Sequence, residues 1–190
     1  QSETAGLSIN GNSPTSLSGR LTELCAKRDS IILKVVDSYE AMYCEDVTFL
    51  VKKYLQALPG KMIGIHTHNN RQLAYGNTIQ AIIDGANYLD GSVYGIGRRP
   101  GNCCIELFLS FLQTPKFSLR PVLELIQKHY LPLREKIEWG YIIPYMITGM
   151  LNEHPRVAIA FRKSAERDDF VKFYDTLTTP EPEDVIRKKP

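Results

Sequence analysis

The arrangement of apolar segments constrains the fold of this chain more than any other feature. A continuous apolar run at residues 31–36, broken only by Lys34, is typical of a strand buried in a parallel sheet. Residues 45–57 follow with apolar side chains at i, i+3, i+4 and i+7, which predicts an amphipathic helix. Strand and helix alternate throughout: further strands are predicted at 7–9, 61–66 and 88–93, and further helices at 15–28, 71–84 and 105–112. Strand–helix units with a period of about thirty residues indicate an α/β fold with a parallel sheet.

The composition of the chain argues against several function classes. The 190 residues carry a net charge of only +2, and their basic side chains are scattered, so the sequence favours no nucleic-acid partner. The longest apolar stretch, residues 141–151, contains Pro144 and is too short to cross a bilayer, so no membrane partner is expected. The four cysteines show no zinc-type spacing and are expected to be reduced thiols. We therefore expect a cytoplasmic protein.

A His-x-His motif lies at the end of one predicted strand. His66 ends the strand 61–66 and His68 lies two residues later, so both imidazoles project to the same face. The carboxyl ends of parallel strands are where α/β folds place their functional residues. Two imidazoles with the amide oxygens of Asn69 and Asn70 nearby would form half of a divalent-metal site. The motif alone is more typical of ordinary surface or hydrogen-bonded structure than of a metal site, so its interpretation depends on the residues downstream.

The downstream residues change that interpretation. Residues 85–90 are predicted as the next strand, and a glycine-rich loop leads from it to Asn102, where the following helix should begin. Residues 64–102, GIHTHNNRQLAYGNTIQAIIDGANYLDGSVYGIGRRPGN, resemble the pyruvate-carboxyltransferase-like metallolyase superfamily, also described as HMG-CoA lyase-like or DRE-TIM. Its members include 4-hydroxy-2-oxovalerate aldolase, hydroxymethylglutaryl-CoA lyase and isopropylmalate synthase. The resemblance covers about residues 35–112 and is greatest for the 4-hydroxy-2-oxovalerate aldolases.

The resemblance implies both a fold and a metal site. It makes the predicted strands the fifth to eighth of a (β/α)8 TIM barrel, so that residues 1–112 would form the C-terminal half of the barrel. In the superfamily, residues at the positions of His66 and His68 bind a divalent metal, and a residue at the position of Asn102 completes or supports the site. The resemblance favours Mn²⁺ or Mg²⁺, and Zn²⁺ would also suit two histidines and a carboxylate.

Residues 113–190 would form an α-helical C-terminal extension with a mobile tail. Helices are predicted there at 117–130 and 168–177, and between them an aromatic-rich segment, 139–150, in which Pro144 suits a helix start. In the aldolases of the superfamily, such an extension covers the active site or contacts a partner enzyme. The resemblance therefore implies an aldehyde dehydrogenase or another copy of the chain as a partner.

One part of the superfamily signature is absent from the sequence. The first barrel strand of the superfamily supplies an Asp ligand, an Arg that stabilises the enolate and often the catalytic base, within an acidic-Thr-x-Arg-Asp-Gly run. No such run occurs in these 190 residues. We expect that the chain is a fragment whose N-terminal barrel half is missing, since it begins in a strand-like segment without a start methionine. The alternative is a natural half-barrel that pairs with another half.

Four further side chains are candidates for the site. Asp37 follows the strand 31–36 in a turn similar to one at the substrate end of the superfamily's barrel, and it is either a catalytic residue or an ordinary cap. Arg98 and Arg99 lie in the loop where phosphate or carboxylate is often held, and solvated loop charge is the alternative for at least one of them. Tyr145 is a candidate acid by analogy with an extension tyrosine of some aldolases, and interface packing is its alternative role.

Three functions remain open. The first is a metal-dependent aldolase that cleaves a 4-hydroxy-2-oxo acid to pyruvate and an aldehyde, with the metal stabilising the pyruvate-like enolate. The second is an acyl-CoA-dependent 2-oxo acid synthase of the same superfamily. The third is a non-catalytic half-barrel that keeps a metal or an interaction surface. A first-strand motif elsewhere in the same gene would exclude the third.

Overall fold

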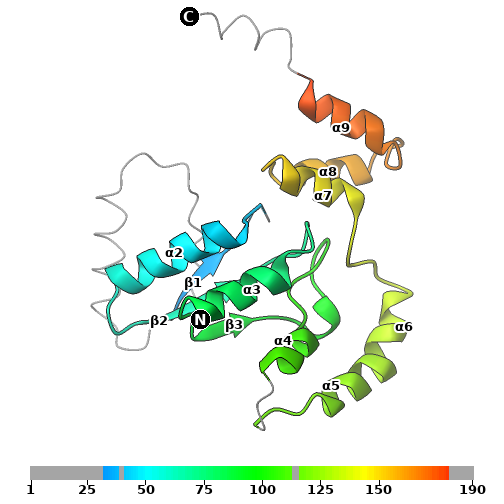
Figure 1. The fold of residues 1–190 in the computed structure, drawn as a ribbon. Helices are drawn as coiled ribbons and strands as arrows, with labels where there is room; N and C mark the ends of the chain where they lie inside the picture. Colours follow the sequence, from blue (N-terminus) through cyan, green and yellow to red (C-terminus); the bar gives the residue numbers. More distant parts are fainter. Residues whose placement is uncertain (1–31, 39–40, 113–115, 180–190) are drawn as a thin grey trace, which may run out of the picture.

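A three-stranded parallel sheet forms the centre of the structure. The computed structural model describes residues 32–38, 41–112 and 116–179. The strands lie in the order β1–β2–β3 and run parallel (Figure 1). Their bounds are β1 (Ile32–Val36), β2 (Met62–His66) and β3 (Tyr88–Asp90). The parallel sheet confirms the predicted α/β class, whereas the strand predicted at 7–9 lies outside the described residues.

A helix follows each strand, as the repeat predicts. These helices are α2 (Cys44–Ala57), α3 (Ala74–Ile83) and α4 (Ile105–Leu112). Glu45 and Asp46 lie in the first turn of α2, where carboxylates interact favourably with the helix dipole. The Asp46 carboxylate also accepts a hydrogen bond from the backbone N–H of Tyr43 at 2.9 Å, which satisfies a donor at the start of the helix. The helix predicted at 15–28 lies outside the described residues.

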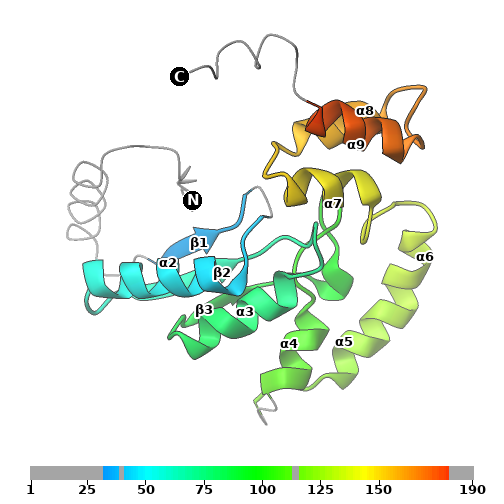
Figure 2. The ribbon, with the colours of Figure 1, turned by 45° about the horizontal axis from the view of Figure 1, so that its top comes forward.

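The outer face of the sheet, defined here as the face toward α2 and α3, carries the main hydrophobic core. Val35 and Ile65, which are 3% and 0% exposed, pack in a cluster with Val47 and Val51 of α2 and with Ala81 of α3. Figure 2 shows the two helices side by side along the strands. Burying a large aliphatic side chain contributes about 1.5–3 kcal/mol. This layer therefore fixes the positions of the strand ends.

Two predicted element boundaries are wrong, and the backbone explains both. The strand predicted at 88–93 ends at Asp90, and Val93–Gly95 forms a 3₁₀ turn (η1) in which Tyr94 has φ 55°. A residue with positive φ cannot continue a strand. The helix predicted at 71–84 begins only at Ala74, because Gln72 has φ 61° and is therefore outside the helical region.

The region after residue 115 contains only helical elements among its described residues. Helical turns run without a break through α5 (Arg120–Leu125), the π-helical segment η2 (Ile126–Tyr130) and α6 (Leu131–Arg134). Pro132 has no backbone N–H, and its ring crowds the carbonyl group four residues earlier. The wider π turn just before Pro132 accommodates both effects. The helical stripe predicted at 117–130 is thus present but extends further.

Three short helices follow in the rest of the described residues. They are α7 (Ile143–Met150), α8 (Arg156–Arg162) and α9 (Phe170–Thr178). Pro144 lies in the first turn of α7, as predicted, whereas α8 was not predicted. A second hydrophobic core joins these helices, in which the rings of Phe161 and Phe173 stack with centroids 4.1 Å apart. The division of the chain at residues 112 and 113 stays a prediction. None of the helices in the described ranges is long and apolar enough to cross a membrane.

Candidate functional site

A small polar pocket lies where β2 ends. It has a volume of about 230 Å³ and is lined by His66, His68, Arg98, Arg99 and Asn102. The two histidines come from the end of β2 and the residues after it, and the other three come from the loop after β3. The structure therefore brings together five side chains that the sequence predicted as site residues from two separate segments.

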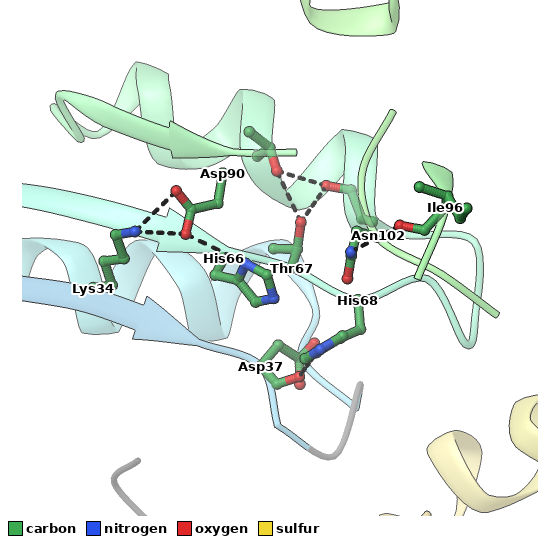
Figure 3. A network of polar contacts seen from close by, with 10 residues as sticks. Lys34, Asp37, His66, Thr67, His68, Asp90, Ile96 and Asn102 are labelled. Carbon is green, nitrogen blue, oxygen red and sulfur yellow. Dashed lines mark hydrogen bonds and ion pairs between the residues drawn. The ribbon is translucent and has the colours of Figure 1, made fainter. Parts of the chain in front are cut away.

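The two imidazole rings lie next to each other. Their centroids are 4.8 Å apart and their planes meet at 84°. Nδ1 of His68 is 2.9 Å from the backbone carbonyl oxygen of Asp37, which fixes the ring through that nitrogen (Figure 3). Burial lowers the pKa of His68, and the charges of His66, Arg99 and Arg98 lower it further against the opposing effect of the Asp37 carbonyl. The lowered pKa favours the neutral form of the ring, which is the form that binds a metal.

His66 contacts a carboxylate that is itself held by a lysine. Its Nδ1 lies 3.4 Å from Oδ2 of Asp90 on β3, and Nζ of Lys34 on β1 lies 2.7 Å from the same oxygen and 3.0 Å from Oδ1 (Figure 3). The Lys34 side chain crosses β2 at Gly64, where a Cβ atom would lie only 2.9 Å from Lys34 Cγ. The glycine thus provides the space through which the three strands share one polar network. Sequence reasoning missed Lys34 and Asp90, although their strand positions place them on the face of His66.

Asn102 reaches the histidines through backbone pairing. Its backbone forms an isolated antiparallel bridge with His68, and the Asn69 N–H donates to the carbonyl oxygen of Gly101 at 3.0 Å. The Asn102 Nδ2 group donates to the Ile96 carbonyl oxygen at 3.2 Å, so the carboxamide oxygen is the atom it offers to a ligand. Gly101 has φ 85°, and a Cβ there would lie 2.0 Å from the carbonyl oxygen of Gly95. Only glycine fits at this position.

A clasp formed by Tyr94, Arg134 and Trp139 holds the same loop from the C-terminal side. The indole N–H of Trp139 donates to the Tyr94 carbonyl oxygen at 2.8 Å, and the Arg134 guanidinium donates to the Tyr94 hydroxyl at 3.0 Å. Arg134 also lies over the Tyr94 and Trp139 rings, 5.2 and 5.9 Å from their centroids. Gly95, the next residue, accepts the backbone N–H of Asn102 at 3.1 Å. No local sequence signal predicts this clasp.

The side chains of two other candidate residues do not line the pocket. The carboxylate of Asp37 is 5% exposed and accepts the backbone N–H groups of Ala41 at 3.0 Å and Met42 at 3.3 Å, which is the geometry of a turn cap. Tyr145 is 3% exposed and packs in the core of α7, α8 and α9, with Arg162 over its ring. The structure does not bring Tyr145 to the pocket; it has the packing role that was the alternative.

The donor set suits a divalent metal but is incomplete. Among the described residues, no group of three His, Cys, Asp or Glu side chains is arranged to hold a metal ion. The pocket offers two imidazoles and one amide oxygen, and the Nδ1 contacts of both rings point to Nε2 as the ligand atom. Mixed N and O donors fit Mn²⁺, Mg²⁺ or Zn²⁺.

The cysteines near the pocket are not suited to nucleophilic chemistry. Burial raises the pKa of Cys103 to about 12 and that of Cys104 to about 11. Both are therefore thiols at neutral pH, and a thiol is a weak nucleophile. Cys44 is exposed at the start of α2.

Comparisons with known proteins identify the family of the chain. The HMGL-like family profile matches residues 5–129. A 4-hydroxy-2-oxovalerate aldolase from Geobacillus thermodenitrificans is 34% identical over 139 residues, which are 72% of this chain and 39% of that protein. The corresponding enzyme from Thermus thermophilus is 36% identical over 96 residues, 50% of this chain and 27% of that protein. An oxaloacetate decarboxylase from Mycobacterium tuberculosis is 40% identical over 85 residues, 43% and 24% of the two chains. The chain thus spans well under half the length of these relatives.

Solved structures show the same fold. The N-terminal domain of a Bacteroides vulgatus protein with a provisional aldolase description has a TM-score of 0.69 and 28% identity, over 83% of this chain and 52% of that one. The carboxyl transferase domain of Rhizobium etli pyruvate carboxylase has a TM-score of 0.57 at 15% identity, over 84% and 29% of the two chains. The strands and helices described above are thus those of a TIM-barrel type domain. The chain therefore belongs to the HMGL-like family.

Proposed function

We propose that this chain carries the metal-binding edge of a divalent-metal-dependent aldolase, which cleaves a 4-hydroxy-2-oxo acid to pyruvate and an aldehyde. The observation that carries the proposal is the pocket in which His66, His68 and Asn102 meet, with the Nδ1 atoms of both rings engaged by other groups. The aldolase relatives from two organisms support the reaction class.

Each residue of the pocket has a defined role in this proposal. His66 and His68 bind the metal through Nε2, while Asp90 and the Asp37 carbonyl group fix the planes of the two rings. Asn102 either contributes its carboxamide oxygen as a ligand or supports the metal site. When bound, Mn²⁺ or Mg²⁺ supplies a Lewis acid for the keto and carboxylate oxygens of a 2-oxo acid, with Zn²⁺ as the alternative ion. Arg98 and Arg99 bind an anionic group of the substrate, a carboxylate or a phosphate.

The described strands are proposed to be the fifth to eighth of the barrel. The remaining strands would supply the third protein ligand and the catalytic base, neither of which the pocket contains among the described residues. Residues 113–190 are proposed to be an extension that contacts an aldehyde dehydrogenase or another copy of the chain. The clasp between Tyr94, Arg134 and Trp139 supports a close connection between the extension and the pocket loop.

A coupled lactate dehydrogenase assay tests the proposed reaction. The chain is combined with the N-terminal half of an HMGL-like barrel and with Mn²⁺, and pyruvate release from a 4-hydroxy-2-oxo acid is followed with and without EDTA. We expect EDTA and His68→Ala each to abolish the release, and His129→Ala, which changes an exposed histidine in η2, to leave it unchanged. Condensation of an acyl-CoA with a 2-oxo acid, in place of pyruvate release, would establish the synthase instead.

A further inference from the structure

The charge of the pocket is unusual for one that would accept a simple monocarboxylate. Its lining consists of two histidines, one amide and two guanidinium groups, and it includes no carboxylate. A bound divalent cation would add more positive charge. A 2-oxo acid with one carboxylate would leave much of this charge unbalanced in a partly buried site.

The two guanidinium groups have no carboxylate partner in the part of the chain that the structure describes. Across residues 32–38, 41–112 and 116–179, no hydrogen bond or ion pair joins Arg98 or Arg99 to a carboxylate, and Nε of Arg99 is buried without a partner. Two other arginines have protein partners: Arg134 has Tyr94, and Arg162 has Glu138. A buried, unpaired guanidinium donor is costly, and such donors are normally satisfied by a ligand or water.

The backbone at Arg99 is also strained. Arg99 has φ 68°, a conformation that is uncommon for residues other than glycine, asparagine and aspartate. Strain of this kind concentrates at binding sites, where it fixes a side chain in place. Arg99 is half-buried in the pocket wall, whereas Arg98 is exposed at its edge.

From these observations we propose that the pocket selects a 2-oxo acid with a second anionic group, which Arg99 binds with support from Arg98. The first carboxylate and the keto oxygen face the histidines, and the second anion lies against the guanidinium groups. This inference rests on the proposed metal-dependent function and names the substrate class of the same pocket. A carboxylate or a phosphate-type group would satisfy the same donors.

A matched pair of ligands tests the inference. 2-Oxovalerate and 2-oxoglutarate have the same five-carbon chain and differ only in a terminal methyl or carboxylate group. Their dissociation constants are measured by calorimetry on the full chain with saturating Mn²⁺, and again without metal. We expect 2-oxoglutarate to bind at least about tenfold more tightly, as a charge-assisted bidentate contact allows. 3-Phosphonopyruvate provides the phosphate-type arm, and the ligand with the larger Arg99-dependent gain identifies the anion.

Variants assign the effect to Arg99. Arg99→Asn removes the charge while tolerating the positive φ, and it should weaken 2-oxoglutarate binding by about 10–100-fold and 2-oxovalerate binding by less than about twofold. Arg98→Gln should have a smaller effect, of about two- to fivefold, because that side chain is exposed. Arg120→Gln, which changes an exposed arginine in α5, is the control for net charge and should change neither constant.

Two results would overturn the inference. One is equal affinity of the unmodified chain for the two five-carbon acids. The other is an equal loss of affinity for both ligands in Arg99→Asn, which would show that Arg99 binds the carboxylate that the two ligands share. If Mn²⁺ and 2-oxovalerate bind but the second anion gives no advantage, the inference fails and the proposed function stands. If Mn²⁺ binds neither the chain alone nor the chain combined with an N-terminal barrel half, the proposed function fails, and the metal-free measurements still decide the role of Arg99.

Discussion

The two faces of the central sheet differ sharply, although the same three strands build both. On the outer face, Val35 and Ile65 are buried beneath α2 and α3. On the opposite, inner face, Met62 and Tyr88 are each 40% exposed, and the Lys34 side chain is 34% exposed. Within the described residues, no pair of helices covers the inner face in the way that α2 and α3 cover the outer one.

The two faces therefore have different roles: one stabilises the fold and the other carries the candidate site. The outer face is apolar and supplies the core, whereas the inner face carries the Lys34–Asp90–His66 network and leads to the pocket. In a closed barrel, inward side chains from opposite strands fill the interior. We infer that the exposed apolar side chains of the inner face mark the surface that the remaining barrel strands cover.

The largest expected effect concerns completion of the barrel. The chain alone should self-associate, because within the described residues its sheet has open edges and an uncovered inner face, and it should show no aldolase activity. Addition of an N-terminal barrel half, in cis or in trans, should yield a defined species with metal-dependent activity. Sedimentation velocity and the pyruvate assay measure both properties. A monodisperse monomer that is fully active alone would contradict the inference that further barrel strands cover the inner face.

A pair of substitutions, one on each face of the sheet, tests the two faces separately. Ile65→Ala on the outer face should lower the free energy of unfolding by about 2–5 kcal/mol, since it leaves a cavity in a packed core. Met62→Ala on the inner face should cost less than about 1 kcal/mol in the chain alone, because its side chain is already partly in water. Urea unfolding gives both values. Similar decreases in the free energy of unfolding for the two variants would show that the inner face is already packed.

Two Lys–Asp pairs offer a second contrast. Asp90→Ala on the inner face should lower Mn²⁺ affinity by about tenfold or more by releasing His66, with little loss of stability. Asp84, near Lys52 on the helical side, accepts hydrogen bonds from Thr48 and Gln80, so Asp84→Ala should destabilise the chain by about 1–3 kcal/mol and leave Mn²⁺ affinity unchanged. Metal titration and urea unfolding of both variants distinguish the roles. A reversed pattern would refute the assignment of Asp90.

The smallest expected effect is a pH dependence of stability. Burial lowers the pKa of folded His68 below its ordinary value, so the unfolded chain binds more protons than the folded chain below about pH 6.5. This histidine should therefore favour the folded state above that pH, and its contribution should be lost as the pH falls through the folded pKa. His68→Gln should flatten the stability profile between about pH 7 and 5. An unchanged profile would contradict the burial of this ring.

The sequence predicted the parts of the fold that depend on local periodicity. The strands at β1 and β2 and the helix α2 follow directly from apolar spacing, and the resemblance indicated the histidines and Asn102. The predicted end of the strand 88–93 was wrong because residues 93–95 form a 3₁₀ turn, and Tyr94 of this turn contacts Trp139 and Arg134, which are distant in sequence. α8 was missed because its seven residues are too few to show a clear period.

The sequence predicted the site residues that belong to a local motif, but not those that only tertiary packing brings to the site. Lys34 and Asp90 appear as single charges in apolar strands, and only the strand register brings them to His66. The buried Nε of Arg99 likewise depends on the path of the loop. Tyr145 was placed by analogy, and its actual position follows from the core of α7 to α9.

The central claim is that the edge of the inner face binds a divalent metal through His66 and His68. Titration of the full chain with Mn²⁺, followed by electron paramagnetic resonance, tests it directly. We predict one binding site, an affinity reduced by about 100-fold or more in His68→Ala, and no change in His129→Ala, since loss of a protein ligand costs several kcal/mol. Equal Mn²⁺ affinity of the unmodified chain and His68→Ala would contradict the account.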